Sequence, residues 1–383
     1  MRNQLKMQLK KLNIMFIGWR MGLFVILILA IPTLPLQFDF LGGGISNYLT
    51  LPHIWAWANF DGEHYLAIAR EGYRPLTYFF FPFYPVLTGL IAKFLNSSTS
   101  FLYSGLIISN IALWLGMIGL MKLIRLDYDV RIEQTTILLL FFFPTSFYFG
   151  SVYTESLFFA LVVWTFYFAR KKDYLKASVL GVLSTATRVV GLALIPALIA
   201  EYIIINNVKK GRFKALVCCS LPILGIFAYM YFLWIKTGNP FEFTKSLEIF
   251  GAQRSSDWVI LPQVFYRYIF KIVPNLNYFY FPVVFTTFLE LFTAMVFLIL
   301  TLSAFWKTRL SYAVFGFLSY LIPTLSGSFS SLPRYALIIF PAFIMASVYL
   351  NKLPKYYTYL INIFLIICLV VATALYTRGY WIS

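Results

Sequence analysis

The sequence predicts an all-α, polytopic membrane protein. Of its 383 residues, 61% are hydrophobic and only 12% are charged, against about 25% charged residues in an ordinary soluble domain. Long apolar runs recur along the chain, and most basic residues lie in the short segments between these runs. The net charge of +17 is therefore interpreted as a sign of membrane topology rather than of nucleic-acid binding. This composition excludes a soluble globular protein.

Eleven apolar runs predict membrane helices, because a crossing needs about 20 mostly apolar residues, or fewer when the helix lies among others. They cover residues 14–36, 101–121, 135–150, 154–169, 176–187, 189–205, 215–235, 283–305, 311–326, 335–350 and 357–377. Arg20 interrupts the first run, and no small-residue cleavage motif follows Leu36. We therefore expect this run to be an anchor rather than a cleaved signal peptide.

The segment 79–95 could be a twelfth crossing or a helix on the membrane surface. If it does not cross and the N-terminus is cytoplasmic, most loop lysines and arginines fall on the cytoplasmic side, as the positive-inside rule requires. A crossing would reverse that balance. Pro82 and Pro85 also favour a short surface helix, since proline starts a helix well and interrupts it badly.

This topology leaves two large loops on the outer face, residues 37–100 and 237–282. We find neither an internal repeat nor a low-complexity linker, so residues 1–383 are predicted to form a single membrane domain. Within the first loop, residues 55–71 have helical spacing, and Gly72 is the expected stop.

The first outer loop also holds the densest group of ionisable side chains. On a helix Asp61, His64 and Tyr65 share one face, whereas Glu63 and Arg70 share another. One interpretation is that Asp61 is only a helix N-cap on a solvated surface. The other is that this end of the helix carries catalytic groups.

Three further charged residues lie at or near the outer ends of apolar runs. Arg188 is flanked by apolar residues, where an unpaired charge is costly. It either pairs with Glu155 or Glu290 or clamps a phosphate. Arg334 lies beside hydroxyl side chains, where snorkelling to the surface and anion binding are both open. Thr154 or Ser156 could cap the helix that begins near Glu155.

Other motifs carry less weight. Asp127-Tyr128-Asp129 resembles a metal and nucleotide-sugar signature, but that signature needs a nucleotide-binding sheet, so we interpret these residues as a charged cytoplasmic loop. The two histidines, His53 and His64, are too few for a catalytic zinc site. The three cysteines have no disulfide or zinc spacing.

Several of these blocks together resemble the PIG-V mannosyltransferase family, a branch of the GT-C membrane glycosyltransferases. The resembling blocks are Phe60-Asp61-Gly62-Glu63-His64-Tyr65 through Tyr73, Phe80-Phe81-Pro82-Phe83-Tyr84-Pro85, Phe142-Phe143-Pro144-Thr145-Ser146, Tyr153-Thr154-Glu155-Ser156, Thr187-Arg188-Val189-Val190-Gly191 and Leu332-Pro333-Arg334-Tyr335. They run in family order from about residue 55 to 341. Phe60 departs from the family, which often has Trp there.

The resemblance implies a GT-C-type fold with about eleven transmembrane helices and interfacial helices in the first outer loop. It further implies transfer of a hexose, typically mannose, from a polyprenyl-phosphate carrier to a hydroxyl acceptor on the outer face. The family usually needs no divalent metal, and its catalytic carboxylate corresponds to Asp61. A lipid-linked donor needs a groove between helices, which explains the missing soluble domain.

The expected mechanism uses Asp61 as general base in an inverting transfer. Cationic side chains stabilise the leaving phosphate, and Arg188, Arg334 and His64 are the candidates. The residues expected to contact the sugar or support these groups are Glu63, Tyr65, Arg70, Glu155 and Tyr335. The acceptor and the choice between mannose and another hexose stay open.

Two alternatives remain at this stage. A multi-pass lipid or sugar transporter would also have many spans, and Glu290 inside the run 283–305 keeps that interpretation open. The second alternative is a noncatalytic subunit of a glycosylation complex, which the presence of Asp61 disfavours. The compact chain lacks a retention signal, so we expect a prokaryotic plasma membrane.

Overall fold

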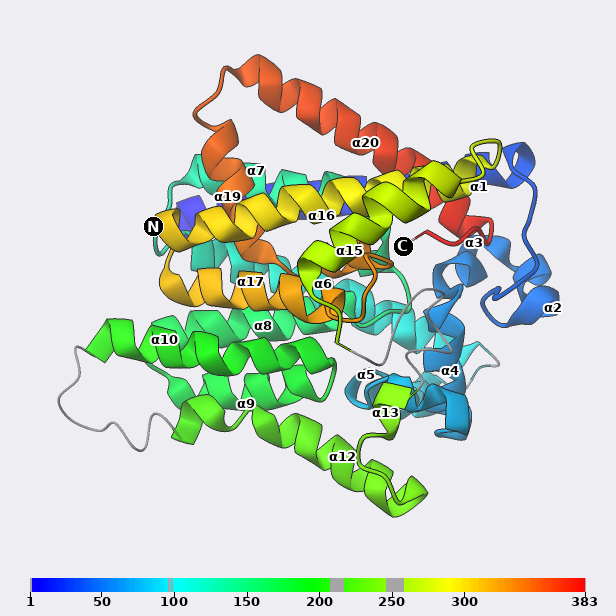
Figure 1. The fold of residues 1–383 in the computed structure, drawn as a ribbon, viewed down its shortest axis with the longest axis horizontal. Coiled ribbons are helices and arrows are strands. Elements are labelled where there is room, and N and C mark those ends of the chain that lie inside the picture. Colours follow the sequence, from blue (N-terminus) through cyan, green and yellow to red (C-terminus); the bar gives the residue numbers. More distant parts are fainter. Residues whose placement is uncertain (1, 96, 98, 207–216, 246–257, 383) are drawn as a thin grey trace.

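The protein is a bundle of helices, and no strand occurs in the part of the chain that is described (Figure 1). The computed structural model describes residues 2–95, 97, 99–206, 217–245 and 258–382. Within these residues, four helices are long and apolar enough to cross a membrane: Met7–Thr33, Ser100–Ile124, Phe281–Lys307 and Lys355–Thr377. The remaining apolar helices are shorter.

All eleven predicted apolar runs contain helix, although residues 215 and 216 of the seventh run lie outside the described residues. The helices of the bundle are α1 (Arg2–Thr33), α6 (Ser100–Ile124), α7 (Val130–Phe142), α8 (Glu155–Arg170), α9 (Tyr174–Thr185), α10 (Leu194–Asn206), α12 (Ile223–Thr237), α16 (Phe281–Lys307), α17 (Leu310–Thr324), α19 (Phe340–Leu350) and α20 (Lys355–Thr377). The number of crossings itself stays a prediction, as does the single-domain organisation.

Shorter elements connect and cover one end of this bundle. They are α2 (Gly44–Thr50), α3 (Pro52–Trp55), η1 (Ala56–Ala58), α4 (Asp61–Glu71), η2 (Pro75–Phe79), α5 (Phe83–Leu95), η3 (Ser146–Gly150), η4 (Val189–Ala193), α13 (Glu242–Lys245), α15 (Leu261–Arg267), η5 (Tyr268–Ile272), η6 (Val273–Asn275) and α18 (Leu332–Ala336).

Four predicted runs differ from the helices. The run 335–350 is broken at residues 337–339, between α18 and α19, and three others differ as follows. The first helix starts at Arg2 rather than residue 14 and ends at Thr33. The run 135–150 splits, because α7 stops at Phe142 and, beyond Pro144, the chain continues as the 3-10 helix η3. The helix in the run 215–235 is interrupted at 221–222, and α12 begins only after Pro222. Proline cannot donate the backbone hydrogen bond that a continuous helix needs, which explains the differences in the runs 135–150 and 215–235.

The predicted continuous helix 55–71 was also wrong, because it is broken immediately before Asp61. Phe60 has φ 57° and ψ −119°, a conformation outside the helical region. The break is held by Asn59, whose Oδ1 accepts from the Gly42 amide at 2.9 Å and whose Nδ2 donates to the Tyr376 carbonyl at 2.9 Å. The predicted stop at Gly72 is confirmed, with φ 83° at the C-cap of α4.

Close packing between α6 and α8 fixes the bundle beside the covered end. A Cβ on Gly116 would lie 2.8 Å from a ring carbon of Phe159, and a Cβ on Gly119 would lie 2.9 Å from the Trp164 indole nitrogen. Such distances are too short for real contacts, so glycine is required for this approach. The packing holds α8 against α6 along the middle of both helices.

Candidate active site at the covered end of the bundle

Asp61 is the first residue of α4, and its position depends on the strained residue before it. The N-cap is Phe60 and no side chain caps the helix, so the interpretation of Asp61 as a simple N-cap was wrong. Its Oδ2 instead accepts from Arg334 Nη1 at 2.5 Å, across 273 residues of sequence. A non-glycine residue at positive φ is uncommon and is retained only where the surrounding structure holds it.

Arg334 lies in α18, which also follows a strained residue. Ser331, the N-cap, has φ 65° and ψ 4°, the left-handed helical region. Besides Asp61, the Arg334 guanidinium contacts Glu155, with 3.4 Å between Nε and Oε1. Arg334 is only 4% exposed, so snorkelling to the surface is ruled out.

Arg188 also contacts the carboxylate of Glu155. Its Nη1 lies 2.5 Å from Glu155 Oε1 and donates to Thr154 Oγ1 at 3.1 Å. The predicted pairing with Glu155 is confirmed, and the pairing with Glu290 was wrong because Glu290 accepts from the Tyr268 hydroxyl at 2.8 Å. Thr154 is the N-cap of α8, but its side chain makes no capping bond.

Asp61, Arg334, Glu155 and Arg188 thus form a row of alternating charge, which we call the site charge chain. The Tyr335 ring lies between the two arginines, with 4.8 Å from Arg188 Cζ and 5.1 Å from Arg334 Cζ to the ring centroid. The two carboxylates and the two guanidinium groups together carry no net charge. Nevertheless, Glu155 Oε2 is buried and accepts no hydrogen bond from the described residues, so the site charge chain retains an acceptor for a polar ligand.

The site charge chain lies in the wall of a cavity of about 460 Å³. The polar part of the wall also includes Tyr65 and Thr187. The remaining lining residues are largely apolar and come from five parts of the chain: Phe79, Phe80, Phe81, Val189, Val190, Leu192, Phe243, Thr244, Trp258, Ile322, Pro323, Leu325 and Ser326. The cavity therefore combines a charged region with an apolar region, as an amphipathic ligand requires.

The other predicted site residues lie on α4 at varying distance from the cavity. Tyr65 lines it, and its hydroxyl is 3.5 Å from Thr154 Oγ1. His64 stacks on Phe80, with 5.2 Å between ring centroids, and is not among the lining residues. Glu63 and Arg70 do not line the cavity either, and the Arg70 guanidinium lies 5.6 Å from the Phe101 ring centroid.

Burial shifts two pKa values on α4. The pKa of His64 is lowered from its ordinary 6.5 because burial disfavours the charged imidazole, although nearby Asp61 opposes this shift. The pKa of Glu63 is raised for the same reason, since burial disfavours the carboxylate. Burial therefore favours the neutral form of the His64 imidazole.

Sequence reasoning missed the apolar part of the cavity. Phe80 and Phe81 belong to a block already noted for its family resemblance, but no role followed from it. Phe243, Trp258 and Pro323 carried no signal, because an aromatic or proline residue beside a membrane helix is commonplace.

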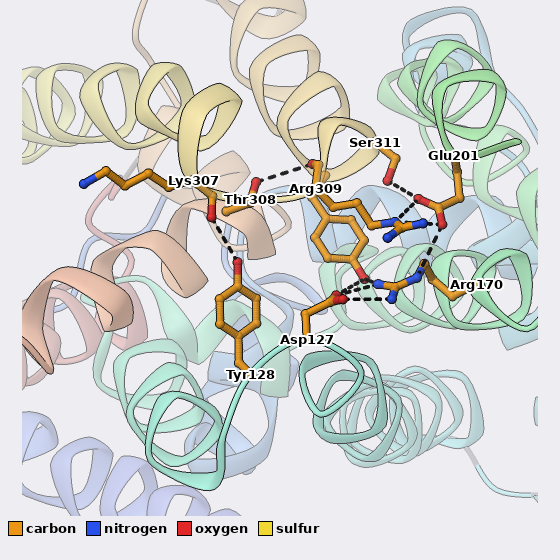
Figure 2. Close-up of polar contacts among 9 residues, drawn as sticks. Asp127, Tyr128, Arg170, Glu201, Lys307, Thr308, Arg309 and Ser311 are labelled. Atoms are coloured by element: carbon orange, nitrogen blue, oxygen red, sulfur yellow. Dashed lines mark hydrogen bonds and ion pairs between the residues drawn. The ribbon is translucent and has the colours of Figure 1, made fainter. Parts of the chain in front are cut away.

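Within the described residues, no group of three or more His, Cys, Asp or Glu side chains is placed to hold a metal ion. The Asp127-Tyr128-Asp129 motif lies at the opposite end of the bundle. Asp129 caps α7 by accepting from the amides of Arg131 and Ile132, and Asp127 pairs with Arg170 (Figure 2). The interpretation as a charged loop is confirmed.

Two solved structures share this fold. ArnT from Cupriavidus metallidurans bound to undecaprenyl phosphate is similar with a TM-score of 0.51 at 13% sequence identity, covering 95% of this chain and 76% of that chain. The apo state of ArnT from the same organism gives 0.50 at 15% identity, covering 95% and 74%. No curated protein sequence matches the chain significantly.

These similarities show that the helical bundle has the fold of the GT-C membrane glycosyltransferases. The sequence model described as Mannosyltransferase (PIG-V) matches residues 36–231, which is just over half of the chain, and the protein therefore belongs to the PIG-V mannosyltransferase family. The predicted family, fold class and enzyme class are confirmed, and the protein is an integral membrane protein.

Proposed function

We propose that the protein transfers a hexose, mannose by its family, from a polyprenyl phosphate to a hydroxyl acceptor on the outer face of a prokaryotic plasma membrane. The observation that carries this proposal is the convergence of Asp61, Glu155, Arg188 and Arg334 on one cavity with an apolar extension. The structural relative ArnT binds undecaprenyl phosphate, which supports the same class of carrier for this chain.

In the proposed reaction, the acceptor oxygen attacks the anomeric carbon of the sugar while the bond from that carbon to the phosphate oxygen breaks. Asp61 takes the acceptor proton, and the leaving phosphate departs with the bonding electron pair. The configuration of the carbon inverts. Among the described residues, no hydrogen bond reaches Asp61 Oδ1, because Arg334 holds only Oδ2, so Oδ1 is available as the base.

The two arginines stabilise the leaving phosphate. Each guanidinium has five donors in a fixed fork, and the contacts with Asp61, Glu155, Thr154 and Tyr335 use only part of this capacity. We expect no divalent metal in this role, since charge-assisted hydrogen bonds in a partly dry cavity serve the same purpose. His64, the third predicted donor, stacks on Phe80 and does not line the cavity, so the contacts give it no such support.

The contacts support Glu155, Tyr65 and Tyr335 as residues that hold the arginines or meet the sugar. They give no such support to Glu63 and Arg70, which do not line the cavity. The family and the fold favour the transferase over the transporter. Glu290 was the residue that favoured the transporter interpretation. It accepts a hydrogen bond from Tyr268 and is not among the cavity residues.

Asp61→Asn is the central test. The amide keeps an oxygen that accepts from Arg334, so we expect the variant to fold, but it removes the base. Turnover with a radiolabelled polyprenyl-phosphate mannose in reconstituted membranes should fall by about 10² to 10⁴-fold. Undiminished turnover would remove Asp61 from the mechanism.

Arg188→Ala serves as the matched comparison, because it alters phosphate contacts without touching Asp61. The donor KM should rise by about tenfold or more, in line with the loss of a charged hydrogen bond. An unchanged donor KM would contradict the phosphate-binding role of Arg188.

A further inference from the structure

A second row of alternating charge lies at the opposite end of the bundle (Figure 2). Arg170 binds Asp127 through two hydrogen bonds, Nη1 to Oδ2 at 2.5 Å and Nη2 to Oδ1 at 2.8 Å. Its Nε lies 3.3 Å from Glu201 Oε1. Arg309 Nε donates to both oxygens of Glu201, at 2.9 and 2.8 Å. We call Asp127, Arg170, Glu201 and Arg309 the distal charge chain.

Glu201 is the centre of the distal charge chain. Its side chain is 0% exposed, compared with 10% for Arg170 and 23% for Arg309. Ser311 Oγ donates a further hydrogen bond to Glu201 Oε2 at 2.5 Å. A buried carboxylate with this many partners holds the elements that supply them in one arrangement, because any displacement leaves a charge unpaired.

The two charge chains are built on the same elements. Helix α8 begins at Glu155 and ends at Arg170, so it contributes one residue to each chain. The segment of η4 and α10 follows Arg188 and carries Glu201. Helix α17 follows Arg309 directly and leads, through residues 325–331, to Arg334. In Figure 1 these helices run side by side between the two ends.

Helix geometry couples the two ends. With 16 residues, α8 is about 24 Å long at 1.5 Å per residue, so a tilt of about 5° around one end moves the other by about 2 Å. The contact between Glu155 and Arg188 is only 2.5 Å long. A displacement of that size would separate the groups of the site charge chain.

We propose that Glu201 is a positioning residue for the donor site. It fastens α8, α10 and α17 at their distal ends, and this keeps Glu155, Arg188 and Arg334 in register at the cavity. The inference deepens the proposed function and rests on it for the identity of the donor. The distal charge chain is not in contact with the substrate and is not catalytic.

Glu201→Gln tests the proposal, because the amide keeps the shape of the side chain and removes its charge. We expect faster hydrogen–deuterium exchange in peptides covering 184–193 and 329–337. We also expect the donor KM of the folded fraction to rise about tenfold, by analogy with other remote misplacements. Glu201→Asp keeps the charge, so its exchange rate and donor KM should lie between those of the wild type and of Glu201→Gln.

Glu133→Gln is the matched control. Glu133 is also buried and pairs with Arg125, but α6 and α7 supply no cavity residue. This control should alter neither exchange at the site nor donor KM. A purely stabilising role of Glu201 would lower the folded yield and leave both site readouts of the folded molecules at their wild-type values, and that result would overturn the proposal.

If Glu201→Gln does not fold, Ser311→Ala replaces it, since this variant removes one hydrogen bond to Glu201 and keeps both ion pairs. Ser311→Ala should raise the exchange rate at the site and the donor KM, each by less than Glu201→Gln would. An unchanged exchange rate would overturn the proposal. If the wild type transfers no hexose from any polyprenyl phosphate, the proposed function fails. The exchange measurement still decides the role of Glu201.

Discussion

Arg334 contacts both carboxylates of the site charge chain, and this dual contact sets the geometry of Asp61 and Glu155. Such an arrangement leaves the carboxylate of Asp61 oriented by one oxygen and open at the other. The proposed phosphate contacts then depend on two arginines rather than on a metal ion.

Removal of divalent metals should leave the transfer rate unchanged. Because Arg188 and Arg334 carry the charge that stabilises the leaving phosphate, the proposed mechanism has no step that needs a divalent metal ion. Transfer by reconstituted protein is measured before and after treatment with EDTA, with Mg²⁺ and Mn²⁺ added back as the control. A loss of activity that these ions restore would contradict the proposal.

The donor KM should not depend on the charge of His64 between pH 6.5 and 8. Burial lowers the pKa of this imidazole from its ordinary 6.5, so the neutral form predominates over that range. Wild type and His64→Gln should therefore show donor KM profiles of the same shape. If a charged His64 bound the phosphate, the wild-type KM would rise with pH and the variant would lose that rise.

The same shift has a consequence for stability. Below pH 6.5 the unfolded state binds a proton at His64 before the folded state does, so this residue's contribution to folding stability is lost as the pH falls. The melting temperature of the wild type in detergent should therefore decrease more between pH 7.5 and 5.5 than the melting temperature of His64→Gln. An equal drop would argue against the lowered pKa.

At the scale of elements, the two short helices that carry Asp61 and Arg334 both begin after a non-glycine residue at positive φ. These are Phe60 before α4 and Ser331 before α18. Strain of this kind is kept where the surrounding packing holds the chain, and it directs the first turn of each helix toward the cavity. The positions of the first turns of α4 and α18 therefore depend on whether residues 60 and 331 can adopt a positive φ.

Substitutions at Ser331 test this sensitivity. Ser331→Gly should keep full activity and raise the melting temperature, because glycine relieves a left-handed conformation that costs about 1 kcal/mol for other residues. Ser331→Val should raise the donor KM, since a β-branched residue resists this conformation and turns Arg334 away. Equal donor KM in both variants would show that the backbone at 331 does not position Arg334.

At the scale of the whole molecule, the proposed topology places the first loop and the segment after α8 on opposite sides of the membrane. The assignment depends on 79–95 being a surface helix. The structure forms α5 over Phe83–Leu95, with Pro85 in its first turn, so the helix includes residues before Pro85. Its 13 residues amount to about 20 Å, the same length as α7 and α10, so the surface position stays a prediction that depends on the charge balance of the loops.

Cysteine labelling tests the topology. After replacement of Cys218, Cys219 and Cys368, single cysteines are introduced at Arg74 and Lys171, both exposed. A membrane-impermeant maleimide should label Arg74→Cys in intact cells and Lys171→Cys only in inside-out vesicles. Labelling of both positions from the same side would mean that 79–95 crosses the membrane.

The sequence by itself determined the helical membrane class, the eleven apolar runs and the family. Helical spacing and apolar length are local properties, and they follow directly from the residues. The motif around Asp61 and the isolated charges at 155, 188 and 334 were recognised as well, because a charge beside apolar runs is costly unless it has a partner.

Only the tertiary structure decided which of these charges meet. Asp61 and Arg334 are 273 residues apart, and no local pattern connects them. The break before Asp61 depends on Asn59 reaching Tyr376 near the end of the chain. The apolar part of the cavity and the distal charge chain likewise require helices to be placed side by side. Pairing across such distances is a property of packing, and periodicity along the chain carries no record of it.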